Sequence, residues 1–149
     1  FSDIHRLNML DILTSGQDDI QVDSFEILAD NQISYTIDTV RYLFEKYKKA
    51  SLYMVVGSDL INTIHSWKEW GEIKEKVNII CFRRSGYHNI NPKDKEIIFL
   101  DSVDLSISSS FIKKEMISNS SYNFANFSNM ISKDIYDYIC HNKLCEKPL

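Results

Sequence analysis

The sequence predicts an α/β fold, a Rossmann-like parallel sheet with helices on both faces. Two apolar runs, Leu52–Val56 and Val77–Phe82, have the length and β-branched content of strands buried on both faces, and Glu96–Leu100 adds a third strand. Segments with helical spacing of apolar residues alternate with these strands. Because this alternation is typical of crossovers between parallel strands, we expect one domain over residues 1–149.

Composition excludes several classes of protein. The chain has 44% hydrophobic and 26% charged residues, which suits one soluble globular domain. A net charge of −4 without a dense Lys/Arg run argues against a protein that coats nucleic acid, since phosphate neutralisation needs a basic face. No apolar run approaches the roughly 20 residues of a membrane span. The four glycines are too scattered for a dinucleotide fingerprint or a P-loop.

The cysteines indicate the compartment. Cys81, Cys140 and Cys145 are odd in number and form no C-x-x-C pair, so neither a disulfide framework nor a zinc site is predicted. Unpaired thiols are typical of a reducing environment, and we therefore expect a cytoplasmic protein.

Further elements follow from local signals. Ser2 is placed to cap a helix that Gly16 ends, and Ser132 to cap the last helix. Apolar residues within Ile20–Ile27 suggest an irregular strand. Ser34–Thr39 opens another helix, and its hydroxyls suit either capping of the first N–H groups or binding of an anion.

The end of the strand Leu52–Val56 is the first candidate site. In an open parallel sheet, ligands bind beyond the carboxyl ends of the strands. Gly57 would let a ligand approach the backbone, and Asp59 would present a carboxylate to it. Trp67 and Trp70 follow. The alternative is a plain strand, turn and helix whose tryptophans fill the core, and the residues alone favour neither interpretation.

Two further segments suit phosphate. Arg83 and Arg84 end the second strand, where they fit an anion or simply solvent. Ser108–Ser110 stand at a helix N-terminus with Lys113 about one turn later, a pattern that favours oxyanions over a plain serine cap.

In order and spacing, these segments resemble the bacterial nicotinate mononucleotide adenylyltransferases. The matching segments span nearly the whole chain: His5–Leu10, Ser34–Thr39, Val56–Leu60, Trp67, Arg83–Tyr87, Ile107–Lys113 and Tyr138–Ile139. The resemblance implies a nucleotidyltransferase of NAD biosynthesis that joins the adenylyl group of ATP to nicotinate mononucleotide, giving deamido-NAD and pyrophosphate. It also implies Mg²⁺ with ATP as co-substrate, and no covalent enzyme intermediate.

The resemblance assigns two sets of binding residues. It places Tyr35, Thr36 and Trp67 around the pyridine ring and its carboxylate. Lys68 would contribute there mainly through its backbone, and Arg83 would lie near the mononucleotide. For the ATP ribose and phosphates it implies Gly57, Asp59, Ser108, Ser109, Ser110 and Lys113.

The sequence departs from the family pattern at two places. Ser110 and Lys113 replace the Thr and Arg of the I-S-S-T-x-I-R motif, so we expect weaker ATP binding because the guanidinium fork is lost. The amino-terminal G-x-F-x-P-x-H-x-G-H segment, whose histidines line the triphosphate site in the family, does not occur in these residues. We therefore expect the first strand, phosphate loop and first helix of the fold to be missing here. No catalytic residue or metal ligand is predicted in this chain, which should by itself be inactive and poorly soluble.

Two alternative functions remain. A sister nucleotidyltransferase acting on pantetheine phosphate or another phosphate ester would share the sheet and the serine helix, but Ser34–Thr39 and Trp67 argue for a pyridine nucleotide. The chain could also be a non-catalytic, nucleotide-binding remnant.

Overall fold

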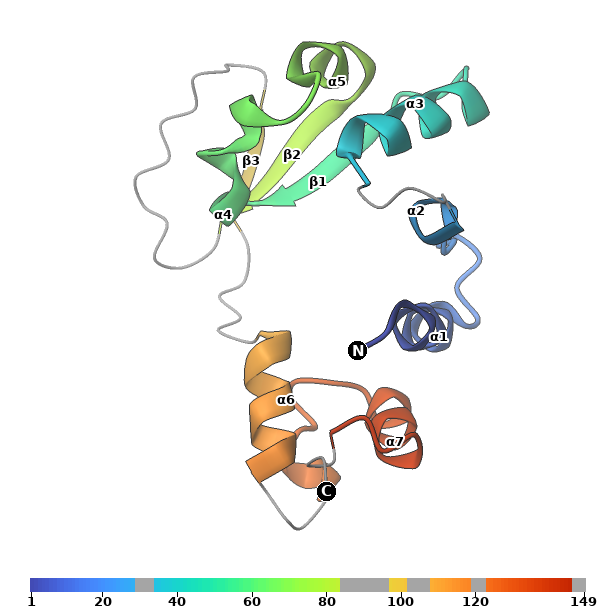
Figure 1. Cartoon of the computed structure of the whole chain (residues 1–149), viewed down its shortest axis with the longest axis vertical. Helices are drawn as coiled ribbons and strands as arrows, with labels where there is room; N and C mark the ends of the chain where they lie inside the picture. The colour runs from blue at the N-terminus through green and yellow to red at the C-terminus, as the bar shows by residue number, and fades with distance from the viewer. Residues whose placement is uncertain (29–33, 84–96, 102–107, 119–122, 146–149) are drawn as a thin grey trace. The chain divides into compact units, whose positions relative to one another are not determined.

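The computed structural model describes residues 1–28, 34–83, 97–101, 108–118 and 123–145 (Figure 1). The chain forms two compact units. Residues Leu28–Ser106 make up the first, called here the sheet unit. Phe1–Ile27 and Ile107–Leu149 make up the second, called here the helical unit.

Parallel strands form the centre of the sheet unit. β1 (Tyr53–Gly57), β2 (Asn78–Arg83) and β3 (Ile98–Asp101) are hydrogen-bonded in the order β1-β2-β3 (Figure 1). Val56 of β1 lies opposite Cys81 of β2, and both side chains are buried. The predicted strands and their parallel arrangement are therefore confirmed, with boundaries shifted by one or two residues.

Helices α3 (Thr36–Lys46) and α5 (Trp70–Lys76) pack on one face of this sheet. The short α4 (Ser58–Ile61) and the 3₁₀ helix η1 (Ile64–Ser66) follow β1 and contribute to the same core. Because side chains alternate along a strand, every second strand residue joins these helices. The buried residues are Ile37, Val40, Val56, Ile61, Ile64, Trp70, Ile73, Val77, Ile79, Cys81 and Ile97.

The opposite face of the sheet carries exposed apolar side chains. Tyr53 and Val55 of β1 are 57% and 60% exposed, so the prediction that the strand Leu52–Val56 is buried on both faces is wrong. The reason is that α3 and α5 bury only the alternate residues of each strand. The same exposed set includes residues of all three strands: Tyr53, Val55, Phe82, Ile98 and Leu100.

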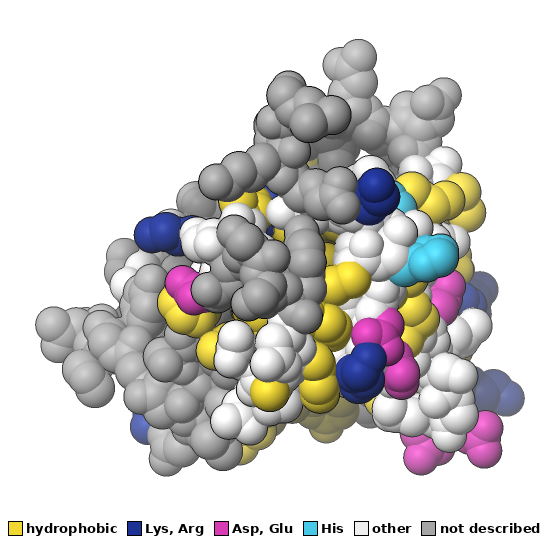
Figure 2. Space-filling model, turned by 90° about the horizontal axis from the view of Figure 1, so that it is seen from below, with side chains coloured by type: hydrophobic (Ala, Val, Ile, Leu, Met, Phe, Trp, Pro, Cys, Tyr) yellow, Lys and Arg dark blue, Asp and Glu magenta, His cyan; other side chains and the backbone are white. Residues whose placement is uncertain are grey.

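The helical unit consists of α1 (Asp3–Thr14), α6 (Ser109–Ser118) and α7 (Lys133–His141), with the 3₁₀ helix η2 (Phe124–Asn126) between the last two. Its core lies among these helices and is formed by Met116, Phe127, Ile135, Tyr136, Ile139 and Cys145. On the face drawn in Figure 2, apolar side chains run through the middle of the described surface, and basic and acidic side chains lie mainly to either side of them.

Hydrogen bonds fix α1 against α7. The Tyr138 hydroxyl lies 2.8 Å from His5 Nδ1 and accepts a hydrogen bond from Asn8 Nδ2 at 2.9 Å. His5 therefore has a structural partner within the helical unit.

Most predicted helix boundaries are confirmed, whereas one predicted strand is wrong. Gly16 follows α1 with φ of 77°, a conformation that favours glycine, and the Ser132 hydroxyl accepts the Ile135 N–H at 3.4 Å at the start of α7. Within Ile20–Ile27 the backbone forms no strand, and α2 (Phe25–Leu28) begins instead. The Asp23 carboxylate accepts the Phe25 N–H at 2.9 Å, which favours a helical turn over an extended chain.

An ion pair joins α3 to α5 and makes stability depend on pH. Arg41 Nε donates to Glu72 Oε1 at 2.9 Å, and a second guanidinium nitrogen pairs with Glu72 Oε2. The hydrogen bond from Arg41, together with the nearby positive charges of Arg41 and Lys76, lowers the pKa of Glu72 below its ordinary value. A lowered carboxyl pKa stabilises the folded state above the ordinary pKa, and this contribution is lost as pH falls through the lowered value.

We expect Glu72→Gln to unfold at a lower temperature than the natural protein at neutral pH. The difference should shrink as pH falls below the ordinary carboxyl pKa of 4.5, and it should vanish once pH is below the lowered pKa of Glu72. Thermal unfolding followed by circular dichroism across the acid range measures it. Glu45→Gln is the matched control, because Glu45 pairs with Lys48 only on the surface of α3, at 3.0 Å. A difference between Glu72→Gln and the natural protein that stays constant with pH would contradict this account.

Candidate functional site

A pocket of about 290 Å³ lies at the N-terminus of α3 in the sheet unit. Two separate segments line it, residues 34–36 before and within the first turn of α3 and residues 66–68 after η1. The lining residues are Ser34, Tyr35, Thr36, Ser66, Trp67 and Lys68. We call it the Tyr35–Trp67 pocket. It brings together all but Arg83 of the residues predicted for the pyridine mononucleotide.

The two tryptophans have different roles in this structure. Trp70 is a core residue, 9% exposed, whereas Trp67 is only partly buried and lines the pocket. Their rings meet edge to face, with centroids 6.4 Å apart and an interplanar angle of 79°. Such contacts fix ring orientation. Trp70 thus follows the core interpretation and holds Trp67 in place as a pocket wall.

Positive charge gathers at the same pocket. Lys68 Nζ lies 4.2 Å from the centroid of the Tyr35 ring, a cation–π distance. Tyr35 occupies the N-cap position of α3 and makes no capping hydrogen bond with its side chain. The N-terminus of this 11-residue helix, which carries a partial positive charge, therefore borders the pocket together with the ammonium. An aromatic wall with two positive features suits a flat, anionic ligand.

The backbone after Lys68 turns sharply. Glu69 has φ of 54°, in the left-handed region, and stands at the N-cap position of α5. A non-glycine residue there costs about 1–2 kcal/mol, which the surrounding packing must offset. This turn allows Trp67 and Lys68 to line the pocket, while Trp70, three residues after Trp67, lies in the core.

At the end of β1, the predicted ATP residues Gly57 and Asp59 lie outside the residues that line the pocket. Gly57 has φ of −82° and ψ of 154°, an extended conformation open to any residue. Backbone conformation therefore does not account for this glycine. Asp59 is exposed in the first turn of α4, beside the fully buried Ser58.

Arg83 ends β2, and its guanidinium lies 5.3 Å from the centroid of the Phe99 ring. This cation–π contact with β3 holds an exposed arginine at the carboxyl end of the sheet. Arg84 and the segment 85–87, which also belong to the predicted motif, lie outside the described residues.

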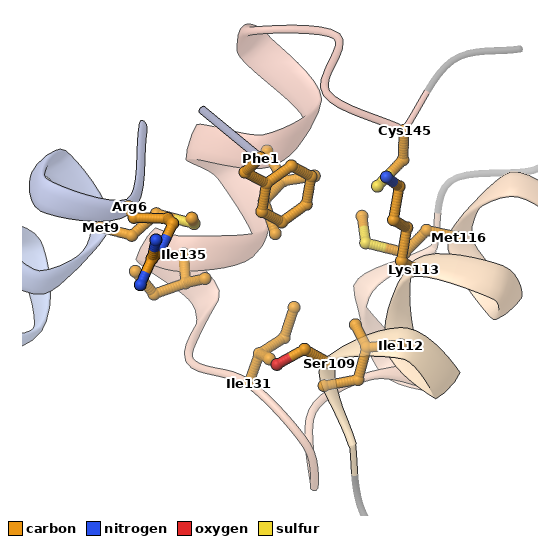
Figure 3. A pocket seen from close by; sticks show the side chains of 11 residues that line it. Phe1, Arg6, Met9, Ser109, Ile112, Lys113, Met116, Ile131, Ile135 and Cys145 are labelled. Carbon is orange, nitrogen blue, oxygen red and sulfur yellow. The ribbon is translucent and has the colours of Figure 1, made fainter. Parts of the chain in front are cut away.

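The predicted phosphate residues at the start of α6 have different surroundings in the structure. The Ser108 hydroxyl accepts the Phe111 N–H at 3.1 Å, so Ser108 caps the helix as in the simpler interpretation. Ser109 and Lys113 instead line a second cavity, of about 320 Å³ and within the helical unit (Figure 3). Ser110 is exposed and does not line that cavity.

Arg6 of α1 lines the same cavity as Lys113, although the sequence analysis gave it no site role. It carries an exposed ion pair with Asp3 at 2.9 Å, one helical turn away. No local pattern separates Arg6 from an ordinary surface arginine, because only the packing of the helical unit places α1 and α6 around one cavity.

The described residues contain no group of three His, Cys, Asp or Glu side chains that could hold a metal ion. Nor does any helix of the described residues have the length and apolar character needed to cross a membrane.

Comparisons with known proteins show which proteins this chain is similar to. Residues 1–115 match the family described as cytidylyltransferase-like. A probable nicotinate-nucleotide adenylyltransferase of Carboxydothermus hydrogenoformans is 30% identical, over 96% of this chain and 73% of its own length. One from Clostridium novyi is 31% identical, over 74% of this chain and 60% of its own length. One from Clostridium perfringens is 32% identical, over 56% of this chain and 46% of its own length. The chain therefore covers less than two thirds of the length of the two clostridial relatives.

A solved structure shares the fold. Nicotinic acid mononucleotide adenylyltransferase of Plasmodium falciparum, complexed with APC, superposes with a TM-score of 0.75 at 23% identity, covering 97% of this chain and 76% of the other. The predicted Rossmann-like fold of nucleotidyltransferase type is therefore confirmed, as is the predicted family. The chain belongs to the cytidylyltransferase-like family and, within it, to the nicotinate-nucleotide adenylyltransferases.

Proposed function

We propose that this chain is the substrate-binding part of an enzyme that transfers the adenylyl group of ATP to nicotinate mononucleotide, forming deamido-NAD and pyrophosphate. The observation that carries the proposal is the Tyr35–Trp67 pocket, where Tyr35, Thr36, Trp67 and Lys68 converge from two segments. Relatives named as nicotinate-nucleotide adenylyltransferases, and a P. falciparum enzyme solved in complex with NaAD, support the same activity.

The pocket matches the acid form of a pyridine ring. Trp67 offers a fixed aromatic surface for a flat heterocycle, and such stacking contributes about 1–3 kcal/mol per ring. The carboxylate of nicotinate is attracted by the N-terminus of α3 and by the Lys68 ammonium. Arg83, oriented by Phe99, is proposed to meet the phosphate of the mononucleotide. Pantetheine phosphate, which has no ring, would leave the aromatic wall unused.

The proposed ATP contacts are Gly57 and Asp59 for the ribose and the start of α6 for the phosphates. The Ser108 hydroxyl accepts the Phe111 N–H and keeps its own O–H as a donor, so Ser108, Ser109 and Ser110 are all proposed for phosphate, with Lys113 supplying charge. Magnesium usually keeps several waters and is held largely by substrate phosphates, so Mg²⁺ would bind together with ATP and would neutralise charge on the triphosphate.

The reaction is an in-line displacement at phosphorus. An oxygen of the mononucleotide phosphate attacks the α-phosphorus of ATP and forms a new P–O bond. At the same time the bond breaks between the α-phosphorus and the oxygen that bridges it to the β-phosphorus. Pyrophosphate carries away the leaving electron pair. The residues proposed here position the two substrates for that attack, which is the main contribution a protein makes to phosphoryl-type transfer. We place the reaction in the cytoplasm, in keeping with the free thiols of Cys81, Cys140 and Cys145.

The test uses the complete natural gene product, with MgATP and either nicotinate mononucleotide or pantetheine phosphate. We expect pyrophosphate release with formation of deamido-NAD from the mononucleotide, and no turnover of pantetheine phosphate. Absence of turnover with every mononucleotide would overturn the proposal, while binding of ATP without turnover would support the alternative of a non-catalytic remnant.

A further inference from the structure

His65 is a partly buried histidine to which neither the sequence motifs nor the proposed reaction gives a role. It lies in the middle of η1, between Ile64, which is fully buried, and Ser66, which lines the Tyr35–Trp67 pocket. The His65 side chain is not among the groups that line this pocket. Any effect of His65 on a bound ligand must therefore pass through a neighbouring side chain.

Ring contacts connect His65 to the wall of the pocket. The His65 imidazole packs against the Trp70 indole in a T-shaped arrangement, with ring centroids 6.0 Å apart and an interplanar angle of 86°. Trp70 meets Trp67 in the same manner, as described above. Because aromatic pairs prefer particular relative orientations, each contact restricts the side-chain torsion angles of the next ring. The three rings therefore form a continuous series from His65 through Trp70 to the pocket wall.

Short turns fix the backbone that carries these rings. The Trp67 N–H donates to the Ile64 carbonyl oxygen at 3.1 Å, and the Ser66 N–H donates to that of Thr63 at 2.9 Å. The Ser66 hydroxyl donates to the same Thr63 oxygen at 2.7 Å. Trp67 packs against the core but is only partly buried. With the backbone fixed, the orientation of the Trp67 ring depends on the side chains that its ring contacts.

We propose that His65 is a positioning residue for the pyridine ring of the mononucleotide: its imidazole orients Trp70, and Trp70 orients the Trp67 wall. The identity of the ligand rests on the proposed function, whereas the ring contacts do not. A wall that already has its binding orientation needs no ordering when the mononucleotide binds, and this raises affinity. The step at phosphorus is unaffected, so the effect of His65 belongs in the Michaelis constant for the mononucleotide and not in kcat.

Steady-state kinetics of the complete natural protein, with MgATP and nicotinate mononucleotide, tests the proposal. We expect His65→Ala to raise the Michaelis constant for the mononucleotide about three- to ten-fold, the range for one lost aromatic pair, with kcat within about two-fold. His65→Phe keeps a ring and should restore most of the affinity, whereas His65→Gln keeps a polar group without a ring and should resemble His65→Ala. His141→Ala, which removes an exposed histidine at the end of α7, should change neither constant. Rescue by glutamine but not by phenylalanine, or a loss confined to kcat, would overturn the proposal.

A double-mutant cycle shows whether His65 acts through Trp67. In a Trp67→Ala background the ring that His65 orients is absent, so adding His65→Ala should change the Michaelis constant for the mononucleotide by less than about two-fold. Two substitutions that act independently would instead multiply their separate effects. If the effect of His65→Ala is as large without Trp67 as with it, His65 does not position the Trp67 wall.

Near-UV circular dichroism tests the ring contacts without any substrate, because the tryptophan signal in this range depends on fixed packing of the rings. We expect His65→Ala to alter this signal and His65→Phe to keep most of it, both with the far-UV spectrum of the natural protein. His65→Gln takes the place of His65→Ala if the alanine variant does not fold. An unchanged tryptophan signal in the folded variant would overturn the role of His65, whereas absence of turnover by the natural protein would overturn the adenylyltransferase proposal, so the two failures are distinguishable.

Discussion

Replacing Trp67 by alanine is expected to raise the Michaelis constant for nicotinate mononucleotide by about ten- to a hundred-fold, with a much smaller change in kcat. The reason is that Trp67 forms the aromatic wall of the Tyr35–Trp67 pocket, and loss of one stacked ring costs about 1–3 kcal/mol of binding. Steady-state kinetics of the complete protein at saturating MgATP measures both constants. The Michaelis constant for ATP should stay within about two-fold, since no predicted ATP residue lines this pocket.

Two controls make the result specific to stacking. Trp67→Phe keeps an aromatic face and should recover most of the lost affinity. Tyr53→Ala removes an exposed aromatic of β1 that does not line the pocket, and should leave the Michaelis constant for the mononucleotide unchanged. If turnover by Trp67→Ala survives with an unchanged Michaelis constant, the assignment of the pyridine ring to this pocket is wrong.

Replacing Lys68 by methionine is expected to reduce the preference for nicotinate over nicotinamide mononucleotide by about ten-fold. The Lys68 ammonium, held 4.2 Å from the Tyr35 centroid, can attract a carboxylate but gains little from a neutral carboxamide. This adds a side-chain role to the backbone contact that the family resemblance implies for Lys68. The quantity to measure is the ratio of kcat/KM for the two mononucleotides, which cancels any general loss of activity.

The matched variants separate charge from packing. Lys68→Arg keeps the positive charge and should retain the preference, whereas Lys48→Met removes a charge from the surface of the sheet unit, near the end of α3, and should change nothing. Tyr35→Leu removes the ring that orients the ammonium and should lower the preference in the same direction as Lys68→Met, though less. If the ratio of kcat/KM for nicotinate over nicotinamide mononucleotide is the same in Lys68→Met and the natural protein, the Lys68 side chain does not recognise the carboxylate.

The exposed face of the sheet bears on how the protein is handled in these experiments. Five apolar side chains on one face of the sheet, among them Tyr53 and Val55, form a surface of the kind that promotes association. Kinetic and binding measurements therefore belong at low protein concentration, with the oligomeric state followed by light scattering.

Local sequence alone determined the strands, most helices and the family. Short apolar runs such as Val77–Phe82 specify strands because their length and β-branching fit buried pleated backbone, and Gly16 and Ser132 end or begin helices through conformations available within a few residues. The strand predicted within Ile20–Ile27 was wrong, because a strand forms only beside a partner strand, and the local sequence does not show whether one is within reach.

Only the tertiary structure decided which side chains meet. Trp67 and Trp70 are equivalent in the sequence, yet the left-handed turn at Glu69 sends one into the pocket and the other into the core. Likewise, the burial of one face of the sheet but not the other, and the approach of Arg6 to the cavity of Lys113, depend on which elements pack together. Contacts between residues far apart in sequence carry no local signal, because periodicity fixes the face a side chain occupies and packing alone fixes what that face touches.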